Sequence, residues 1–166
     1  MTKYLVLFLI IAAGYLLLTG SEEIPKGFTS PDAIGEHVVS ALNAKDSDKA
    51  LQVFVPRAIL EEAMDCAGIN PWISDSNDDR VEVNALLRFR WRKPSQPIEF
   101  LGHEVTKTEE FLSGDNIQGC TAKTAITRWI VRMKGRHYFY GGKTESEMGA
   151  NLIQIGSTGE WWVLKR

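Results

Sequence analysis

The sequence predicts an α+β domain in which N-terminal helices pack on a curved antiparallel β-sheet, preceded by a hydrophobic N-terminal segment. Three observations lead to this prediction. Residues 4–18 are apolar and uncharged, residues 30–68 carry helix signals, and residues 98–164 consist of strand-like runs separated by turns. Helices that are followed by an antiparallel meander define the α+β class.

The hydrophobic run at residues 4–18 decides the expected compartment. Its length fits a signal peptide, whereas a membrane span needs about 20 residues. Including residues 19–21 gives a marginal span, and the small residues there offer only a modest cleavage site. No cysteine directly follows the run, which excludes lipid attachment there. We expect residues 1–21 to anchor the chain in the membrane, with secretion after signal cleavage as the alternative.

The rest of the chain is then extracytoplasmic, either periplasmic or at the cell surface. Residues 22–29 contain Pro25 and Gly27 and are expected to form a tether, and residues 30–166 are expected to form a single α+β domain. The net charge of -2 is too small to predict a strongly charged partner.

The stretch at residues 81–91 fits both a half-buried strand and a helix, and we interpret it as a helix. The overlapping sequence "RFRWRK" alternates aromatic and basic residues, as nucleic-acid-binding surfaces do. In an exported domain, arginines that extend past buried rings explain the pattern more simply. We therefore expect no nucleic-acid partner.

The first helix of the domain has a clear beginning. Ser30 can cap it and Pro31 suits its first turn. Its apolar face is expected to comprise Ile34, Val38, Ala41 and Leu42. His37 lies off this face and is interpreted as a solvated side chain. A short helix or turn at residues 44–54 and a helix at residues 56–68 that ends at Gly68 are expected to follow.

Strand signals begin at residue 98. The expected strands are 98–112, 117–134, 136–140, 144–155 and 160–166. The long strand 117–134 contains two sets of residues that are candidates for burial. Cys120, Ala122 and Ile126 lie at even positions, whereas Trp129, Val131 and Met133 lie at odd positions. A regular strand cannot bury both sets on one face, so we predict a β-bulge near Thr127 or Arg128.

The order of these elements resembles the cystatin-like α+β roll of the nuclear transport factor 2-like superfamily, which includes scytalone dehydratase and ketosteroid isomerase relatives. The resemblance covers residues 30–166 and rests on the helix "SPDAIGEHVVSAL", the turn "DSDKALQVF" and the terminal strand "GEWWVL". It implies a cone-shaped roll, and many envelope-anchored members are not enzymes. The isomerase members place a Tyr and carboxylates inside the cone, but none of these maps onto a residue of this chain.

Searches for catalytic and metal motifs give no site. The three histidines are scattered, no CxxC pair exists, and "GGKT" at residues 141–144 lacks the earlier glycine of a phosphate loop. Candidate acid–base groups are Asp65, His103, Glu109 and Tyr140, for which we favour surface or structural roles. We expect no cofactor and no metal.

Aromatic residues of the sheet are the candidate lining of a pocket: Trp129, Tyr138, Tyr140 and Trp161. The favoured function is a non-catalytic cell-envelope binding or assembly module, with a protein partner or a small apolar ligand. The alternatives are a small-molecule enzyme of isomerase or dehydratase type that uses a polar group in a conical pocket, and a structural subunit domain of a membrane complex.

Two pairs of residues carry further expectations. Cys66 and Cys120 lie on the inward sides of their elements, and oxidation is possible outside the cytoplasm. They are candidates for a disulfide, with two separate buried thiols as the alternative. In "EWWVLK", Trp161 and Trp162 point to opposite sides of a strand, so we expect one to be buried and the other to be much less so.

Overall fold

The computed structural model describes residues 26–68, 70–73, 97–139 and 142–164. The hydrophobic segment at residues 1–21, the ambiguous stretch at residues 81–91 and Tyr140 lie outside these residues. The described elements are α2 (Pro31–Ala44), α3 (Ser47–Leu51), α4 (Arg57–Ala63), β1 (Met64–Cys66), β2 (Glu99–Phe111), β3 (Asn116–Ile117), β4 (Cys120–Ala122), β5 (Ile126–Phe139), β6 (Gly142–Ile155) and β7 (Trp161–Leu164). The α+β class is confirmed.

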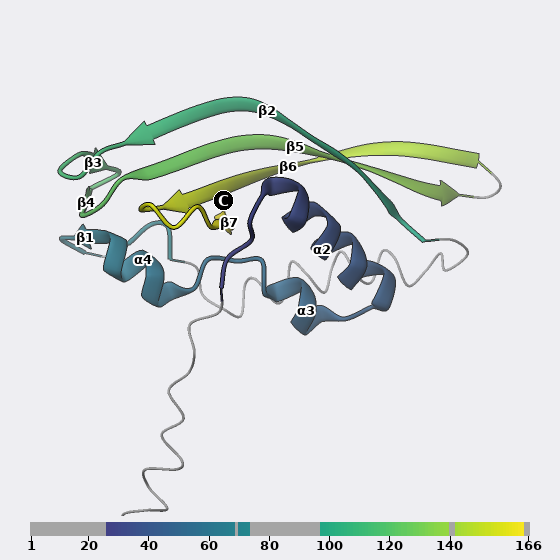
Figure 1. The fold of residues 1–166 in the computed structure, drawn as a ribbon, viewed down its shortest axis with the longest axis horizontal. Helices are drawn as coiled ribbons and strands as arrows, with labels where there is room; N and C mark the ends of the chain where they lie inside the picture. Colours follow the sequence, from purple (N-terminus) through teal and green to yellow (C-terminus); the bar gives the residue numbers. More distant parts are fainter. Residues whose placement is uncertain (1–25, 69, 74–96, 140–141, 165–166) are drawn as a thin grey trace, which may run out of the picture.

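The strands form two antiparallel sheets. The larger sheet has the order β2-β5-β6-β7, and the smaller has the order β1-β4-β3. Strands β5 and β6 pair without interruption from Ile126 opposite Ile155 to Phe139 opposite Gly142. Figure 1 shows β2, β5 and β6 as a long arch, with α2 and α3 below its right part and α4 with β1 below its left end.

Helix α2 begins and ends with local signals. The Ser30 side chain accepts a hydrogen bond from Ala33 N at 3.1 Å, and Pro31 opens the helix. Lys45 ends it in a left-handed conformation (φ 58°). The predicted helix start at Ser30 and Pro31 is thus confirmed. His37 is half-buried instead of solvated, because its Nε2 lies 2.8 Å from Lys49 O of α3.

Helix α2 contacts β2 and the chain just before it at three points along its length. Asp32 Oδ1 lies 2.6 Å from His103 Nδ1 near the start of the helix. One turn later, the Phe100 ring packs directly against Gly35. Near the end, Asn43 bonds both backbone groups of Ile98: Ile98 N donates to Oδ1 at 2.8 Å, and Nδ2 donates to Ile98 O at 2.9 Å. These contacts fix the helix across the sheet.

The helix predicted at residues 56–68 is shorter than expected. It ends at Ala63, Met64 is extended (φ -134°, ψ 146°), and β1 follows. The reason is tertiary pairing: β1 joins β4, with Met64 opposite Ala122 and Cys66 opposite Cys120. The extended backbone at Met64 allows this pairing and buries the Met64 side chain. Local helix propensity does not predict this, because the pairing partner is distant in the sequence.

The long strand predicted at residues 117–134 is also corrected. A turn with Gln118 (φ 54°) and Gly119 (φ 88°) separates β3 from β4, and residues 123–125 separate β4 from β5. The bulge predicted near Thr127 or Arg128 is wrong, because β5 pairs regularly with β6 there. The register shifts lie in β2 instead, between Phe100 and Gly102 and between Val105 and Lys107.

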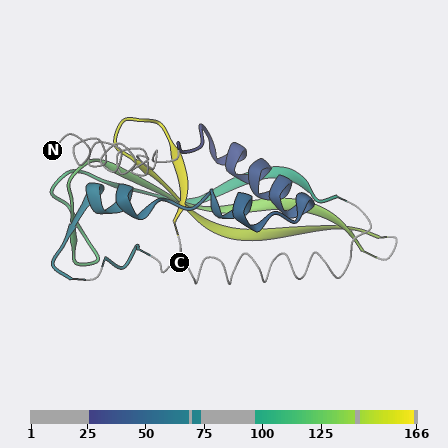
Figure 2. The same cartoon turned by 90° about the horizontal axis from the view of Figure 1, so that it is seen from below.

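Both faces of the larger sheet carry buried side chains. This explains why residues at both even and odd positions of the predicted long strand are buried. One cluster packs with α2 and contains Ile34, Val53, Val131, Met133, Leu152 and Trp161. The other packs with α4 and the smaller sheet and contains, among others, Leu60, Trp72, Cys120, Ile126, Ile153, Trp162 and Leu164. Neighbouring strand residues point to opposite faces, so the clusters lie on opposite faces of the sheet. Figure 2 shows the strong twist of the long strands.

Candidate functional site

The structure brings two of the four predicted pocket residues together. The rings of Trp129 on β5 and Trp161 on β7 have centroids 4.3 Å apart. Trp161 is buried and Trp129 is half-buried. Tyr138 lies on β5, but its side chain is outside the described part of the chain, and so is all of Tyr140. The predicted aromatic lining therefore reduces to this pair of indoles.

An imidazole and a carboxylate extend the indole pair toward α2. His103 stacks near Trp129, with ring centroids 6.5 Å apart and an interplanar angle of 21°. Asp32 Oδ1 accepts a hydrogen bond from His103 Nδ1 at 2.6 Å. The His103 side chain is 20% exposed and that of Asp32 is 54% exposed. The site is thus a partly open row that runs from Asp32 through His103 and Trp129 to Trp161.

This row combines two chemical abilities. A carboxylate that is hydrogen-bonded to one ring nitrogen orients the imidazole, and an oriented imidazole can transfer a proton through its other nitrogen. Indole faces bind apolar rings and cations. Sequence reasoning named His103 among the candidate acid–base groups, with a surface or structural role favoured, and did not connect it with Asp32. The two residues lie 71 positions apart, and no local pattern links them.

A second polar group lies on the opposite face of the larger sheet. Glu109 on β2 contacts Lys107 Nζ at 2.6 Å and also pairs with the guanidinium of Arg128 on β5. The Arg128 guanidinium lies 5.7 Å from the centre of the Trp72 ring. The hydrogen bond from Lys107 and the charge of Arg128 hold the pKa of Glu109 below its ordinary value, against the opposing effect of burial. Glu109, a candidate acid–base group, is therefore a paired carboxylate.

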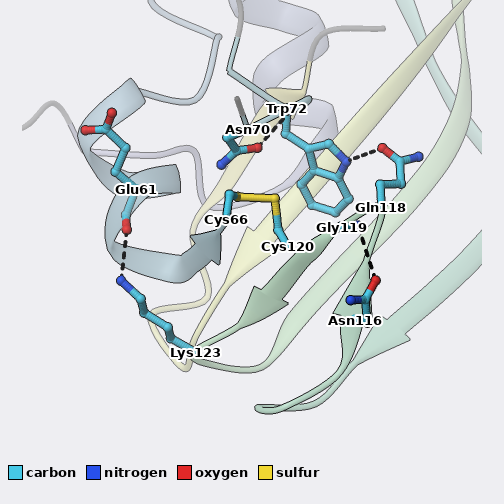
Figure 3. Close-up of a disulfide and its surroundings, with 9 residues drawn as sticks. All are labelled: Glu61, Cys66, Asn70, Trp72, Asn116, Gln118, Gly119, Cys120 and Lys123. Atoms are coloured by element: carbon cyan, nitrogen blue, oxygen red, sulfur yellow. Dashed lines mark hydrogen bonds between the residues drawn. A yellow bond between two sulfur atoms is a disulfide. The ribbon is translucent and has the colours of Figure 1, made fainter. Parts of the chain in front are cut away.

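Cys66 and Cys120 form a disulfide with an S–S distance of 2.04 Å (Figure 3). The two residues are directly opposite on β1 and β4, with Cα atoms 4.1 Å apart. Directly opposite residues of antiparallel strands are close enough for such a bridge. The disulfide therefore joins two strands, and not a helix and a strand as the sequence suggested.

Trp72 packs beside the disulfide and is fixed at both ends (Figure 3). Its backbone N donates to Asn70 Oδ1 at 2.9 Å, and its indole Nε1 donates to Gln118 Oε1 at 3.0 Å. The side chain is 5% exposed. Trp72 is therefore part of the core, and the disulfide belongs to a packed structural region.

The remaining predicted polar candidate lies apart from the aromatic row. Asp65 is exposed on β1, opposite Thr121. Within residues 26–68, 70–73, 97–139 and 142–164, no three His, Cys, Asp or Glu side chains are grouped as metal ligands. In the same ranges, no helix is both long enough and apolar enough to span a membrane.

Comparisons with known proteins add no relative to this description. No family model, no curated protein and no solved structure matches the chain at a significant level. The resemblance to the nuclear transport factor 2-like superfamily therefore stays a prediction from the order of elements.

Proposed function

We propose that this protein is a non-catalytic binding or assembly module of the cell envelope. Residues 1–21 hold it in the membrane, and the α+β domain lies on the outer side. The observation that carries the proposal is the disulfide between Cys66 and Cys120. Disulfides persist in oxidising compartments and are rare in the cytosol. An oxidised cysteine pair behind an uninterrupted hydrophobic run at residues 4–18 supports an exported, anchored domain.

We further propose that the domain is a cone-shaped roll of the nuclear transport factor 2-like type. Its support is the arch of the larger sheet, with α2 across the inner side (Figure 1). The two register shifts in β2 also support it, because bulges bend a strand. The aromatic row on the α2 side of this sheet is then the surface that meets a protein partner or a small apolar ligand.

Localisation and oxidation state test the function together. The full chain is expressed, cells are separated into membrane and soluble fractions, and the N-terminus of the product is sequenced. We expect an intact N-terminus in the membrane fraction and a domain that added protease digests in spheroplasts. Free thiols are blocked at lysis, and we expect neither Cys66 nor Cys120 to be labelled.

A matched pair of variants assigns the anchoring to the apolar run. Ile10→Arg places a charge at the centre of residues 4–18 and should release the chain from the membrane, whereas Thr2→Arg adds the same charge outside the run and should not. A soluble product that begins near Glu22 would contradict the anchor. Two labelled thiols in freshly lysed cells would contradict the extracytoplasmic location.

A second function, a small-molecule enzyme of isomerase or dehydratase type, is favoured by one observation. His103 is paired with Asp32 beside the Trp129 ring, which is a suitable arrangement for proton transfer to an apolar substrate. Its test is the exchange of the α-protons of cyclic apolar ketones with D2O, followed by NMR. Exchange that the wild type accelerates and His103→Gln does not would favour the enzyme, and exchange at the buffer rate would favour the binding module.

A further inference from the structure

The edges of the larger sheet differ in how they are covered. Strand β7 is covered at its outer edge by Phe28, which exchanges two hydrogen bonds with Trp161 (2.7 and 2.9 Å). Further along, Val163 bonds Val53 O at 2.8 Å and Val55 N at 3.0 Å. The chain that enters β2 is covered by Asn43, which bonds both backbone groups of Ile98.

Strand β2 has no strand on its outer side in the described residues, but two register shifts interrupt it. Strand β6 is regular and is also partly open, because β7 pairs only with its residues Asn151–Gln154. In the described part of the chain, the stretch from Gly142 to Gly149 is paired with β5 on one side and has no strand on the other. Every residue of this stretch is exposed, on both faces of the sheet. A regular strand of this kind presents unpaired N–H and C=O groups that a further strand can bond.

We propose that this stretch of β6 pairs antiparallel with the same stretch of a second copy of the chain, centred on Glu145. The two larger sheets then join through β6 of each copy. The pairing is isologous, as in a two-fold dimer. It does not depend on the membrane attachment proposed above.

The charges along β6 favour a second copy as the partner, and the charges together with the paired length favour this register. With Glu145 at the two-fold axis, Lys143 lies opposite the partner's Glu147, and the same pair recurs by symmetry. Thr144 lies opposite the partner's Ser146 on the other face. Opposite charges and paired hydroxyls directly across two strands are both stabilising. Most charged edges discourage pairing, but here the pattern is complementary to itself.

The one like-charged contact of this register is compensated inside each copy. Glu145 lies opposite the partner's Glu145, but its Oε1 already accepts a hydrogen bond from Arg136 Nη2 at 3.0 Å. A register centred on Ser146 would instead place Glu145 opposite the partner's Glu147, twice, with no opposite-charge pair. A register centred on Thr144 would place Lys143 opposite the partner's Glu145, twice, but would pair a shorter stretch of the described strand. The centre at Glu145 is therefore favoured.

Single cysteines introduced into the full chain test the pairing in its own membrane. Cys66 and Cys120 are already bonded to each other, so an added cysteine supplies the one free thiol. After mild oxidation, Glu145→Cys should give a dimer on a non-reducing gel, because opposite Cα atoms are about 4.5–5.5 Å apart in an antiparallel pair. Glu62→Cys, on the exposed side of α4, is the matched control and should give no dimer.

The register and the charges are tested in the same assay. Coexpressed Thr144→Cys and Ser146→Cys chains should crosslink to each other more than either does to itself. Lys143→Glu on the Glu145→Cys background should weaken association about tenfold, because two favourable pairs become repulsive. Adding Glu147→Lys should restore it, since the exchanged charges are again complementary. Thermal unfolding of each variant checks that the domain is folded.

Two outcomes would overturn the proposal. Equal yields at Glu145 and Glu62 would mean that β6 does not pair, even if the chains associate through residues 1–21. A strongest self-crosslink at Thr144 or Ser146, or no restoration by the exchanged charges, would reject the pairing centred on Glu145.

Discussion

Trp161 and Trp162 are adjacent on β7, and each is buried in a separate cluster on its own face of the larger sheet. Trp161 is 7% exposed and packs with the α2 side, and Trp162 is 2% exposed and packs with the side of α4 and the smaller sheet. The expectation that one indole would be much more exposed is therefore wrong. The alternation along the strand is as predicted, but both faces are covered.

The first prediction follows from this double burial. Trp161→Ala and Trp162→Ala should each lower the free energy of unfolding by about 3–5 kcal/mol, because each deletes a large buried ring. Urea unfolding of both variants measures the two losses. Leu112→Ala is the control, since Leu112 is 69% exposed and should change stability by less than about 0.5 kcal/mol. A small loss for either tryptophan would contradict the covering of that face.

The second prediction concerns the contact of α2 with β2 at Gly35. A Cβ placed on Gly35 would lie 2.2 Å from Phe100 Cε2, so Gly35→Ala forces the helix and the ring apart. We expect a loss of about 1–3 kcal/mol from this overpacking, although alanine favours a helix more than glycine does. Gly68→Ala is the matched control, because a Cβ there meets nothing within 4 Å. A stabilised Gly35→Ala variant would mean that the ring moves aside freely.

The third prediction separates the two hydrogen bonds of Asn43. Asn43→Asp keeps the oxygen that accepts from Ile98 N and removes the Nδ2 donor to Ile98 O. We expect Asn43→Ala to destabilise the protein by about 1–3 kcal/mol and Asn43→Asp to destabilise it by less. Amide exchange at Ile98, followed by NMR, should accelerate in the alanine variant only. Equal acceleration in both variants would show that the accepting oxygen does not protect this amide.

The local signals of the sequence predict the parts of the fold that depend on local chemistry. Ser30 and Pro31 start α2 as predicted because capping is a property of a few adjacent residues. Residues 64–66 leave the helix because β4, more than fifty positions later, offers Met64 and Cys66 a strand to pair with. The helical spacing of Ile59, Ala63 and Cys66 gives no information about that partner strand.

The candidate site, like the fold, could be predicted from the sequence only in part. The aromatic residues Trp129 and Trp161 could be selected from the sequence because large rings in strand-like runs are few. Their contact with His103, and the contact of His103 with Asp32, arise only when α2 is laid across β2. The predicted bulge is wrong for a related reason. The change of parity along the sequence predicts an irregular strand, but the structure shows a sheet that is buried on both faces.

The fourth prediction concerns the disulfide. Cross-linking a loop with a sequence separation of 54 stabilises a fold by about 4 kcal/mol in the chain-entropy model. The double variant Cys66→Ser with Cys120→Ser should lose stability of this order, and so should the reduced wild type. Thiol titration of the unfolded, unreduced protein should find no free thiol. Two reactive thiols per chain would mean that strand pairing and packing hold β1 to β4 without a covalent bond.

The last prediction concerns the stability of the Glu109 pairs as the pH changes. Lys107 and Arg128 hold the pKa of Glu109 below its ordinary value of 4.5 in the folded protein. A carboxyl with a lowered folded pKa contributes stability above its unfolded pKa and loses it as the pH falls through the folded value. Glu109→Gln should therefore be less stable than the wild type above about pH 5, with a difference that shrinks as the pH falls below about 4.5.

Urea unfolding of both proteins between about pH 3 and pH 7 measures this difference. Glu110→Gln is the matched control, because Glu110 is the exposed neighbour that points to the opposite face of β2. Its difference from the wild type should stay small at every pH. The reason is that the Lys107 and Arg128 contacts lie on the face of Glu109 and not on that of Glu110. A Glu109→Gln difference that is independent of pH would show that the carboxylate charge does not stabilise this face of the sheet, and the loss would then come from uncharged contacts with Lys107 and Arg128.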